Sequence, residues 1–246
     1  MPRAAALVWG MVAVLLVVPV LTDHFQVGAL PMRVLVTLLL VSAVYSISST
    51  RRTLVIGAGL AAATAVFSLA MALHPAAWLV LVNLLLGAAF YFYAAIALLL
   101  HVQHSRRVTA DTLYSSVASY QLLGLGFAAL YLTTEHLFPG SIKGVLHEQP
   151  PLPFSFLDAM YFSMVTLTTA GFGDISPVSS LARSLAVIET VIGVLFPAIL
   201  MSRLVGLYLI HQEVGVEARN PPAEESSHAH HFAGPDPASG DPESLP

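Results

Sequence analysis

The sequence contains no cysteine, and charged residues make up only 10% of its 246 residues. Without cysteine, the chain can form neither disulfide bonds nor thiolate metal sites. Hydrophobic residues make up 57% of the chain, far more than a soluble domain with so few charges could cover. The net charge of −4 is mild and argues against nucleic-acid binding. These deficits indicate an integral membrane protein.

Six apolar runs are long enough to cross a membrane as helices, which takes about 20 residues each. The first is too long for a signal peptide and no clear cleavage site follows it, so we expect it to be retained. We therefore expect an all-α membrane protein with six transmembrane helices. They are predicted over residues 4–21, 30–47, 54–73, 77–100, 112–134 and 181–210.

The lysines and arginines are unevenly divided between the two sides of this arrangement. Three lie on one side, namely Arg33, Lys143 and Arg183. Cytoplasmic loops are enriched in such residues, so the richer side is predicted to be cytoplasmic. We expect a multi-pass protein of the cell membrane with both termini in the cytoplasm. The richer side holds Arg3, Arg51, Arg52, Arg106, Arg107, Arg203 and Arg219.

The segment between the last two spans has two parts. Residues 135–153 are marked by proline and glycine, which predicts a loop with little regular structure. Ser155 and Asp158 then form a capping-box pattern, which predicts a helix over residues 156–168. At about 1.5 Å per residue this helix is too short to cross a bilayer, so we expect it to be re-entrant. The partial negative charge at its C-terminal end would favour a cation.

The run Thr-Thr-Ala-Gly-Phe-Gly-Asp at residues 168–174 follows this short helix directly. Successive carbonyl groups can face one axis only if neighbouring residues have dihedral angles of opposite hand. Glycine adopts the left-handed ones at little steric cost. A column of such carbonyls, joined by the Thr169 hydroxyl, can replace the water around a dehydrated monovalent cation. The alternative is a glycine-rich turn between two membrane helices.

This run resembles the selectivity-filter signature of potassium channels, which is usually Thr-Thr-Val-Gly-Tyr-Gly-Asp. The resemblance covers residues 112–210 and implies a potassium-selective channel that conducts passively. It also implies a homotetramer in membrane lipid, in which each chain supplies one filter strand. K+ would be the permeant ion, with no cofactor. The implied filter residues are Thr169, Ala170, Gly171, Phe172 and Gly173, of which the first four would bind K+.

Two positions depart from the signature, because Ala170 stands for valine and Phe172 for tyrosine. Phe172 therefore has no hydroxyl to tether the filter wall. Phe162 occupies the position where many members carry the tryptophan that receives this tether, so we expect a Phe162–Phe172 contact instead. These departures leave a weakly selective cation channel as an alternative. Thr168 and Asp174 are expected to support the filter.

Asp174 allows two interpretations. It lies at the expected outer mouth, where it either attracts cations or pairs with Arg183. Glu189 is a carboxyl group in an otherwise apolar span, which makes it a functional candidate. We expect it to be neutral, to face the re-entrant helix and to be hydrogen-bonded there by Ser163, Thr166 or Thr168.

The last span contains a candidate gating hinge. Gly193 lies 20 residues after Gly173, a spacing that resembles the hinge of the family. Pro197 lacks a backbone donor and is expected to kink the helix. Gly193 fits close helix packing equally well, so both interpretations stay open.

We expect four parts along the chain. Residues 1–101 form a four-helix transmembrane domain, 102–111 a cytoplasmic linker, 112–211 the pore domain and 212–246 a disordered cytoplasmic tail. The first four helices stand where a voltage sensor would, but residues 77–100 contain no arginine or lysine, so no intrinsic voltage gating is expected. We expect no regulatory domain within this tail. Its histidines imply no fixed metal site, and they are His228, His230 and His231.

An enzyme is the remote alternative. Residues 171–174 also fit the Gly-x-Gly-Asp motif of intramembrane aspartyl proteases. That chemistry needs a second aspartate within the membrane, and no other aspartate lies inside a predicted span. We therefore expect no catalytic residues and no enzymatic activity.

Overall fold

The computed structural model describes residues 51–74, 76–105, 109–144 and 154–219, together with Ala5, residues 8–10 and Val12. The predicted span over residues 30–47, most of the one over 4–21, and the three histidines of the tail lie outside this part. The chain divides into two units, Met1–Ser202 and Arg203–Pro246, and the contacts described below lie within the first unit.

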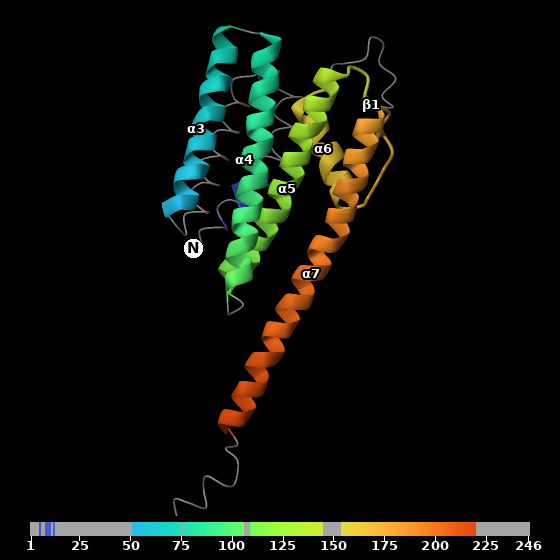
Figure 1. The fold of residues 1–246 in the computed structure, drawn as a ribbon. Helices are drawn as coiled ribbons and strands as arrows, with labels where there is room; N and C mark the ends of the chain where they lie inside the picture. Colours follow the sequence, from blue (N-terminus) through green and yellow to red (C-terminus); the bar gives the residue numbers. More distant parts are fainter. Residues whose placement is uncertain are drawn as a thin grey trace, which may run out of the picture. The chain divides into compact units, whose positions relative to one another are not determined.

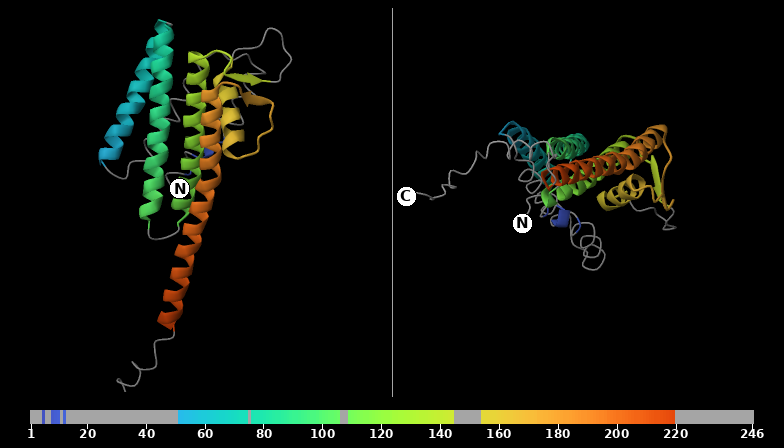
Figure 2. Two further views of the ribbon diagram at one scale, coloured as in Figure 1. Left: turned by 45° about the vertical axis from the view of Figure 1, so that its right-hand side comes forward. Right: turned by 90° about the horizontal axis from the view of Figure 1, so that it is seen from below.

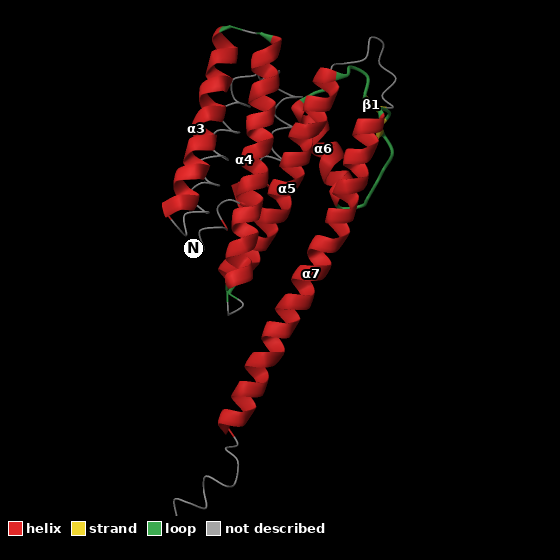
Figure 3. Ribbon diagram, in the orientation of Figure 1, coloured by secondary structure: helices red, strands yellow, loops and turns green. Residues whose placement is uncertain are grey.

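Five helices make up most of the described chain (Figures 1 and 3). Four are long and apolar enough to cross a membrane, and each covers a predicted span. The fifth, α6, has 12 residues and is the predicted short helix. The described part is therefore mostly helical, as expected for an all-α membrane protein. The helices are α3 (Arg51–Leu73), α4 (Ala77–His104), α5 (Ala110–Leu137), α6 (Phe156–Leu167) and α7 (Ser180–Arg219).

Two segments differ from the sequence prediction. Strand β1 (Ile142–Gly144) lies in the loop expected to have little regular structure. It pairs antiparallel with strand β2 (Ile175–Pro177). Strand β2 directly follows residues 168–174, which are called the filter run from here on. Local sequence could not reveal β1, because the partner strand lies beyond α6. Helix α7 also continues through Pro197 to Arg219, so residues 212–219 are helical although a disordered tail was predicted. Once a helix is formed, adding residues to it is favourable.

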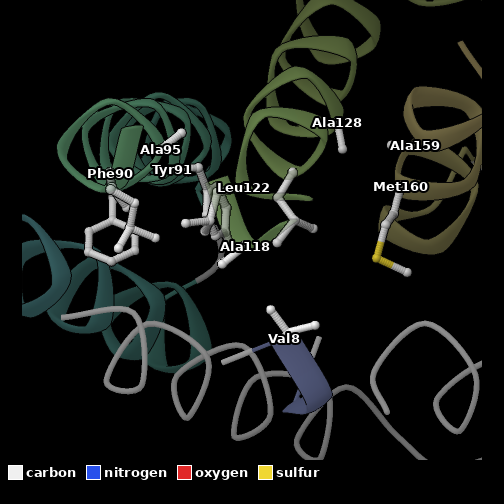
Figure 4. Packing of buried hydrophobic residues seen from close by; sticks show 12 residues of the cluster. Val8, Phe90, Tyr91, Ala95, Ala118, Leu122, Ala128, Ala159 and Met160 are labelled. Carbon is white, nitrogen blue, oxygen red and sulfur yellow. The ribbon is translucent and has the colours of Figure 1, made fainter. Parts of the chain in front are cut away.

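Helices α4, α5 and α6 contribute both small and large side chains to one buried core (Figure 4). Alanines such as Ala95, Ala118 and Ala159 let the backbones approach closely, as membrane helices commonly do. Leu122 and Met160 are among the larger side chains of this core. In both views of Figure 2, α6 lies beside α5. This core holds α6 against the rest of the described helices.

The capping box predicted at the start of α6 is confirmed. The Asp158 N–H donates to Ser155 Oγ at 3.2 Å, and the Ser155 N–H donates to Asp158 Oδ2 at 2.8 Å. Both groups belong to the first turn of the helix, where backbone N–H groups lack partners within the helix. The box therefore sets the first residue of α6 at Phe156.

Candidate ion-conducting site

Helix α6 ends in a tight turn that leads into the filter run. The Thr169 N–H donates to the Thr166 carbonyl at 3.0 Å, and the Ala170 N–H donates to the Val165 carbonyl at 2.9 Å. With the left-handed φ of 60° at Thr169, these bonds form a Schellman motif. Glycine is the usual residue at this place. A threonine there stores about 1–3 kcal/mol of backbone strain.

Left-handed residues alternate along the run that follows. The φ angle is 60° at Thr169, 54° at Gly171 and 81° at Gly173. The prediction that the two glycines adopt left-handed dihedrals is confirmed. Thr169 was missed, because threonine rarely adopts them. Every second residue from 169 to 173 therefore has the hand that lets successive carbonyl groups share one side.

The backbone hydrogen bonds show in which direction the carbonyls of Thr169 and Ala170 point. The N–H groups of Ala170 and Gly171 both donate to the Val165 carbonyl, at 2.9 and 3.3 Å, and so point toward α6. In a trans peptide the N–H and the preceding C=O point in opposite directions. The carbonyls of Thr169 and Ala170 therefore point away from α6. Residues 168–174 are all exposed in this chain, so these oxygens lie on its open side.

Phe162 and Phe172 form no ring pair within the described part of the chain, so their predicted contact in an assembled pore stays a prediction. Phe162 is only 5% exposed and packs edge-on against Tyr131 of α5, with ring centroids 4.7 Å apart. Phe172 is 72% exposed. Phe162 faces α5 because an edge-to-face aromatic pair is a favourable way to fill the space between the two helices.

Tyr161 is a site residue that the sequence analysis missed. Its hydroxyl donates to Asp174 Oδ2 at 2.7 Å and so ties the end of the filter run to α6. The alternative pair of Asp174 with Arg183 is not formed in the described part of the chain. Arg183 Nε instead donates to the Pro177 carbonyl at 3.3 Å. Thr168 is the C-cap of α6, and its hydroxyl donates to the Met164 carbonyl at 2.7 Å.

The segment after the filter run is fastened to the end of α5. The Glu135 carboxylate accepts the N–H groups of Gly140 and Ile142 at 2.7 and 3.0 Å. The Ser141 carbonyl accepts the Val178 and Ser179 N–H groups, and β1 pairs with β2 beside them. The filter run is therefore held by α6 before it and by this small sheet after it.

Glu189 lies completely buried on α7 and faces α6, as predicted. Ser163 Oγ lies 2.5 Å from Glu189 Oε1, so one of the three suggested partners is confirmed. The second partner is Tyr131 of α5, whose hydroxyl donates to Glu189 Oε2 at 2.6 Å. Tyr131 could not be identified from the sequence, because its contact with Glu189 depends on how α5 packs against α7.

Gly193 lies where α7 meets the last residue of α6. A Cβ atom at Gly193 would lie 1.9 Å from the Leu167 carbonyl oxygen, so no side chain fits there. The Tyr120 hydroxyl of α5 donates to the same oxygen at 2.8 Å. Close packing, the second interpretation of Gly193, therefore describes its place in this structure. Pro197 is exposed within α7, and its role as a hinge stays a prediction.

Comparison with known proteins shows which sequences this chain resembles. A family model described as "Ion channel" matches residues 125–209. "Protein LctB" of Geobacillus stearothermophilus is 32% identical over 109 residues, which are 42% of this chain and 78% of that protein. "Two-pore potassium channel 4" of Arabidopsis thaliana is 43% identical over 58 residues, which are 24% of this chain and 20% of that protein.

"Two pore potassium channel c" of Oryza sativa subsp. japonica is 31% identical over 109 residues, which are 44% of this chain and 23% of that protein. No solved structure gives a significant match. The apolar helices and the matched pore segment define a membrane ion channel. The chain belongs to the same family as Protein LctB, and its residues 125–209 match the ion-channel model.

Proposed function

We propose that four copies of this chain form a potassium-selective pore through which K+ crosses the cell membrane passively. One observation carries the proposal. Every second residue from Thr169 to Gly173 is left-handed, while the Ala170 and Gly171 N–H groups bond to α6 and turn two carbonyls to the open side. Main-chain oxygens arranged in this way are the ligands that replace the hydration shell of K+. Four strands around an axis would complete the coordination.

The proposed architecture has six spans, with α6 as a re-entrant helix between the last two. With 12 residues, α6 is about 18 Å long, well short of the roughly 30 Å thickness of the hydrocarbon core. The non-helical run after it is stable at that depth only if it lines a watery path or is buried in protein. Both termini would be cytoplasmic, so the loop that contains β1 would face outward.

A weakly selective cation channel of the same architecture is the second candidate. Phe172 has no hydroxyl and is 72% exposed, so within the chain its ring does not brace the filter wall. A protease site has less support in the described residues. Asp158 is occupied by the capping box, and Asp174 by Tyr161.

We also propose that the pore is not intrinsically voltage-gated, because α4 carries no arginine or lysine from Ala77 to Leu100.

The chain offers a matched pair of glycines to test the proposal. Gly173 and Gly140 have φ angles of 81° and 84°, and neither has any atom within 4 Å of an added Cβ. Gly173→Ala and Gly140→Ala therefore impose similar local strain, the first inside the filter and the second outside it. In liposomes with a potassium gradient, we expect wild type and Gly140→Ala to carry K+ flux and Gly173→Ala to carry none.

Selectivity is measured on the same proteins as the reversal potential under unequal sodium and potassium. A reversal potential close to that of potassium supports the first proposal, and one near zero supports the weakly selective channel. Equal K+ flux through both glycine variants would contradict the assignment of residues 169–173 as the filter.

A further inference from the structure

Four buried polar groups from three helices form a chain of short contacts behind the filter. Tyr131 OH lies 2.6 Å from Glu189 Oε2, Ser163 Oγ lies 2.5 Å from Glu189 Oε1, and Ser163 Oγ also lies 2.6 Å from the Gly124 carbonyl oxygen. Tyr131, Ser163 and Glu189 are each 0% exposed. Tyr131 and Gly124 belong to α5, Ser163 to α6 and Glu189 to α7.

The number of protons that these contacts need decides whether the Glu189 carboxyl group is charged or neutral. Three oxygen–oxygen contacts at hydrogen-bond distance need three protons. The hydroxyls of Tyr131 and Ser163 supply one each, and the carbonyl of Gly124 supplies none. The third proton must therefore reside on Glu189. In the described part of the chain, no basic side chain forms an ion pair with Glu189 that would favour its charged form.

The opposite arrangement leaves one contact without a proton. If Glu189 were a carboxylate, Tyr131 and Ser163 would both donate to it, and nothing would lie between Ser163 Oγ and the Gly124 oxygen at 2.6 Å. One hydroxyl cannot serve two acceptors that are both this close, because a hydrogen bond weakens steeply away from linearity. A buried carboxylate without a cationic partner is also costly in a membrane helix.

We propose that Glu189 is a neutral carboxylic acid that donates from Oε1 to Ser163, so that Ser163 in turn donates to the Gly124 carbonyl. Tyr131 donates to Oε2 and completes a directed chain that links α7 to α6 and α6 to α5. Glu189 is thus a positioning residue for the filter, because Ser163 lies half a turn before Val165, whose carbonyl anchors Ala170 and Gly171. This role rests on the proposed pore function, whereas the ionisation state does not.

A second contact on the same face supports the positioning role. Gly193 lies one turn after Glu189 on α7, and it meets Leu167, which lies one turn after Ser163 on α6. The two helices therefore touch at two successive turns. The first contact is the hydrogen bond between Glu189 and Ser163, and the second is the packing of Gly193 against the Leu167 backbone. Only the first of these contacts depends on a proton.

Infrared spectroscopy of the full chain in liposomes tests the ionisation state. We expect wild type to show the C=O band of a buried protonated carboxylic acid, which Glu189→Gln lacks. Thr190→Val is the control, because the Thr190 hydroxyl bonds only within α7, to the Ala186 carbonyl. It should keep the band and the flux. A wild type without the acid band overturns the proposal, and because this measurement uses wild type it stands even if a variant fails to fold.

Potassium flux through the same liposomes tests the positioning role. A glutamine can donate to Ser163 and accept from Tyr131, so Glu189→Gln should retain flux within about threefold of wild type, whereas Glu189→Leu should lose about tenfold or more. Equal loss in both variants would show that hydrogen bonds from a glutamine do not replace those of Glu189, and it would overturn the positioning role. If wild type carries no flux while the acid band is present, the pore function fails and the neutral acid stands.

Discussion

Replacing Gly193 by alanine should separate the helices that support the filter. The added Cβ would lie 1.9 Å from the Leu167 carbonyl oxygen and 2.8 Å from its carbon, and ordinary contacts begin at 3.4 Å. The obstacle is backbone at the end of α6, so no side-chain rotation relieves it. Helix α7 would have to move away by roughly 1.5 Å, and forcing extra atoms into a packed interface typically costs about 1–3 kcal/mol.

The same movement would strain two hydrogen bonds beside this contact. Glu189, one turn earlier on α7, contacts Ser163 of α6 at 2.5 Å and Tyr131 of α5 at 2.6 Å, and both contacts would lengthen. Gly206→Ala is the matched control, because Gly206 lies on the same helix with nothing within 4 Å of an added Cβ. There alanine should be neutral or stabilise by up to about 1 kcal/mol through its higher helix propensity.

The assay compares thermal unfolding of the detergent-solubilised protein and K+ flux in liposomes for both variants. We expect Gly193→Ala to unfold at a lower temperature than wild type and to lose most of its flux, and Gly206→Ala to match wild type. A Gly193→Ala protein as stable and as conductive as wild type would refute the close-packing assignment. A residue that served only as a flexible hinge would instead gain stability on substitution by alanine.

Two further contacts around the filter run can be tested in the same way. Tyr161→Phe removes the hydrogen bond to Asp174 and should loosen the end of the filter run, so that K+ raises the unfolding temperature less than it does for wild type. An unchanged effect of K+ on the unfolding temperature would contradict this tether. Glu135→Ala removes the acceptor of the Gly140 and Ile142 N–H groups and should lower stability by about 1–3 kcal/mol in a thermal melt, with ion selectivity unchanged. A change of selectivity without loss of stability would contradict that role.

The long elements of the fold were predictable because each depends on local sequence. Runs of apolar residues define α3, α4, α5 and α7, and the pair Ser155 and Asp158 sets the start of α6. The handedness of Gly171 and Gly173 was also predictable, because glycine tolerates it and the filter requires it. These features depend on residues within a few positions of each other.

The partners of the buried and loop residues were not predictable. Tyr131 meets Glu189 and Phe162 only because α5 lies beside both α6 and α7. Strand β1 exists only because β2 lies next to it after the filter run. The left-handed Thr169 runs against the preference of its residue type and is held by two helix-capping hydrogen bonds. In each case the cause is a tertiary contact that local patterns do not contain.

The two contacts between α6 and α7 constrain where α7 can bend. Glu189 and Gly193 meet Ser163 and Leu167 one turn apart, so a bend at Gly193 would move α7 against the end of α6 and disturb the turn that holds Ala170 and Gly171. Pro197 lies one turn further on, is exposed, and lacks the N–H that would bond to the preceding turn. A bend there leaves both contacts intact. We therefore expect the proposed pore to open by a bend at Pro197 rather than at Gly193.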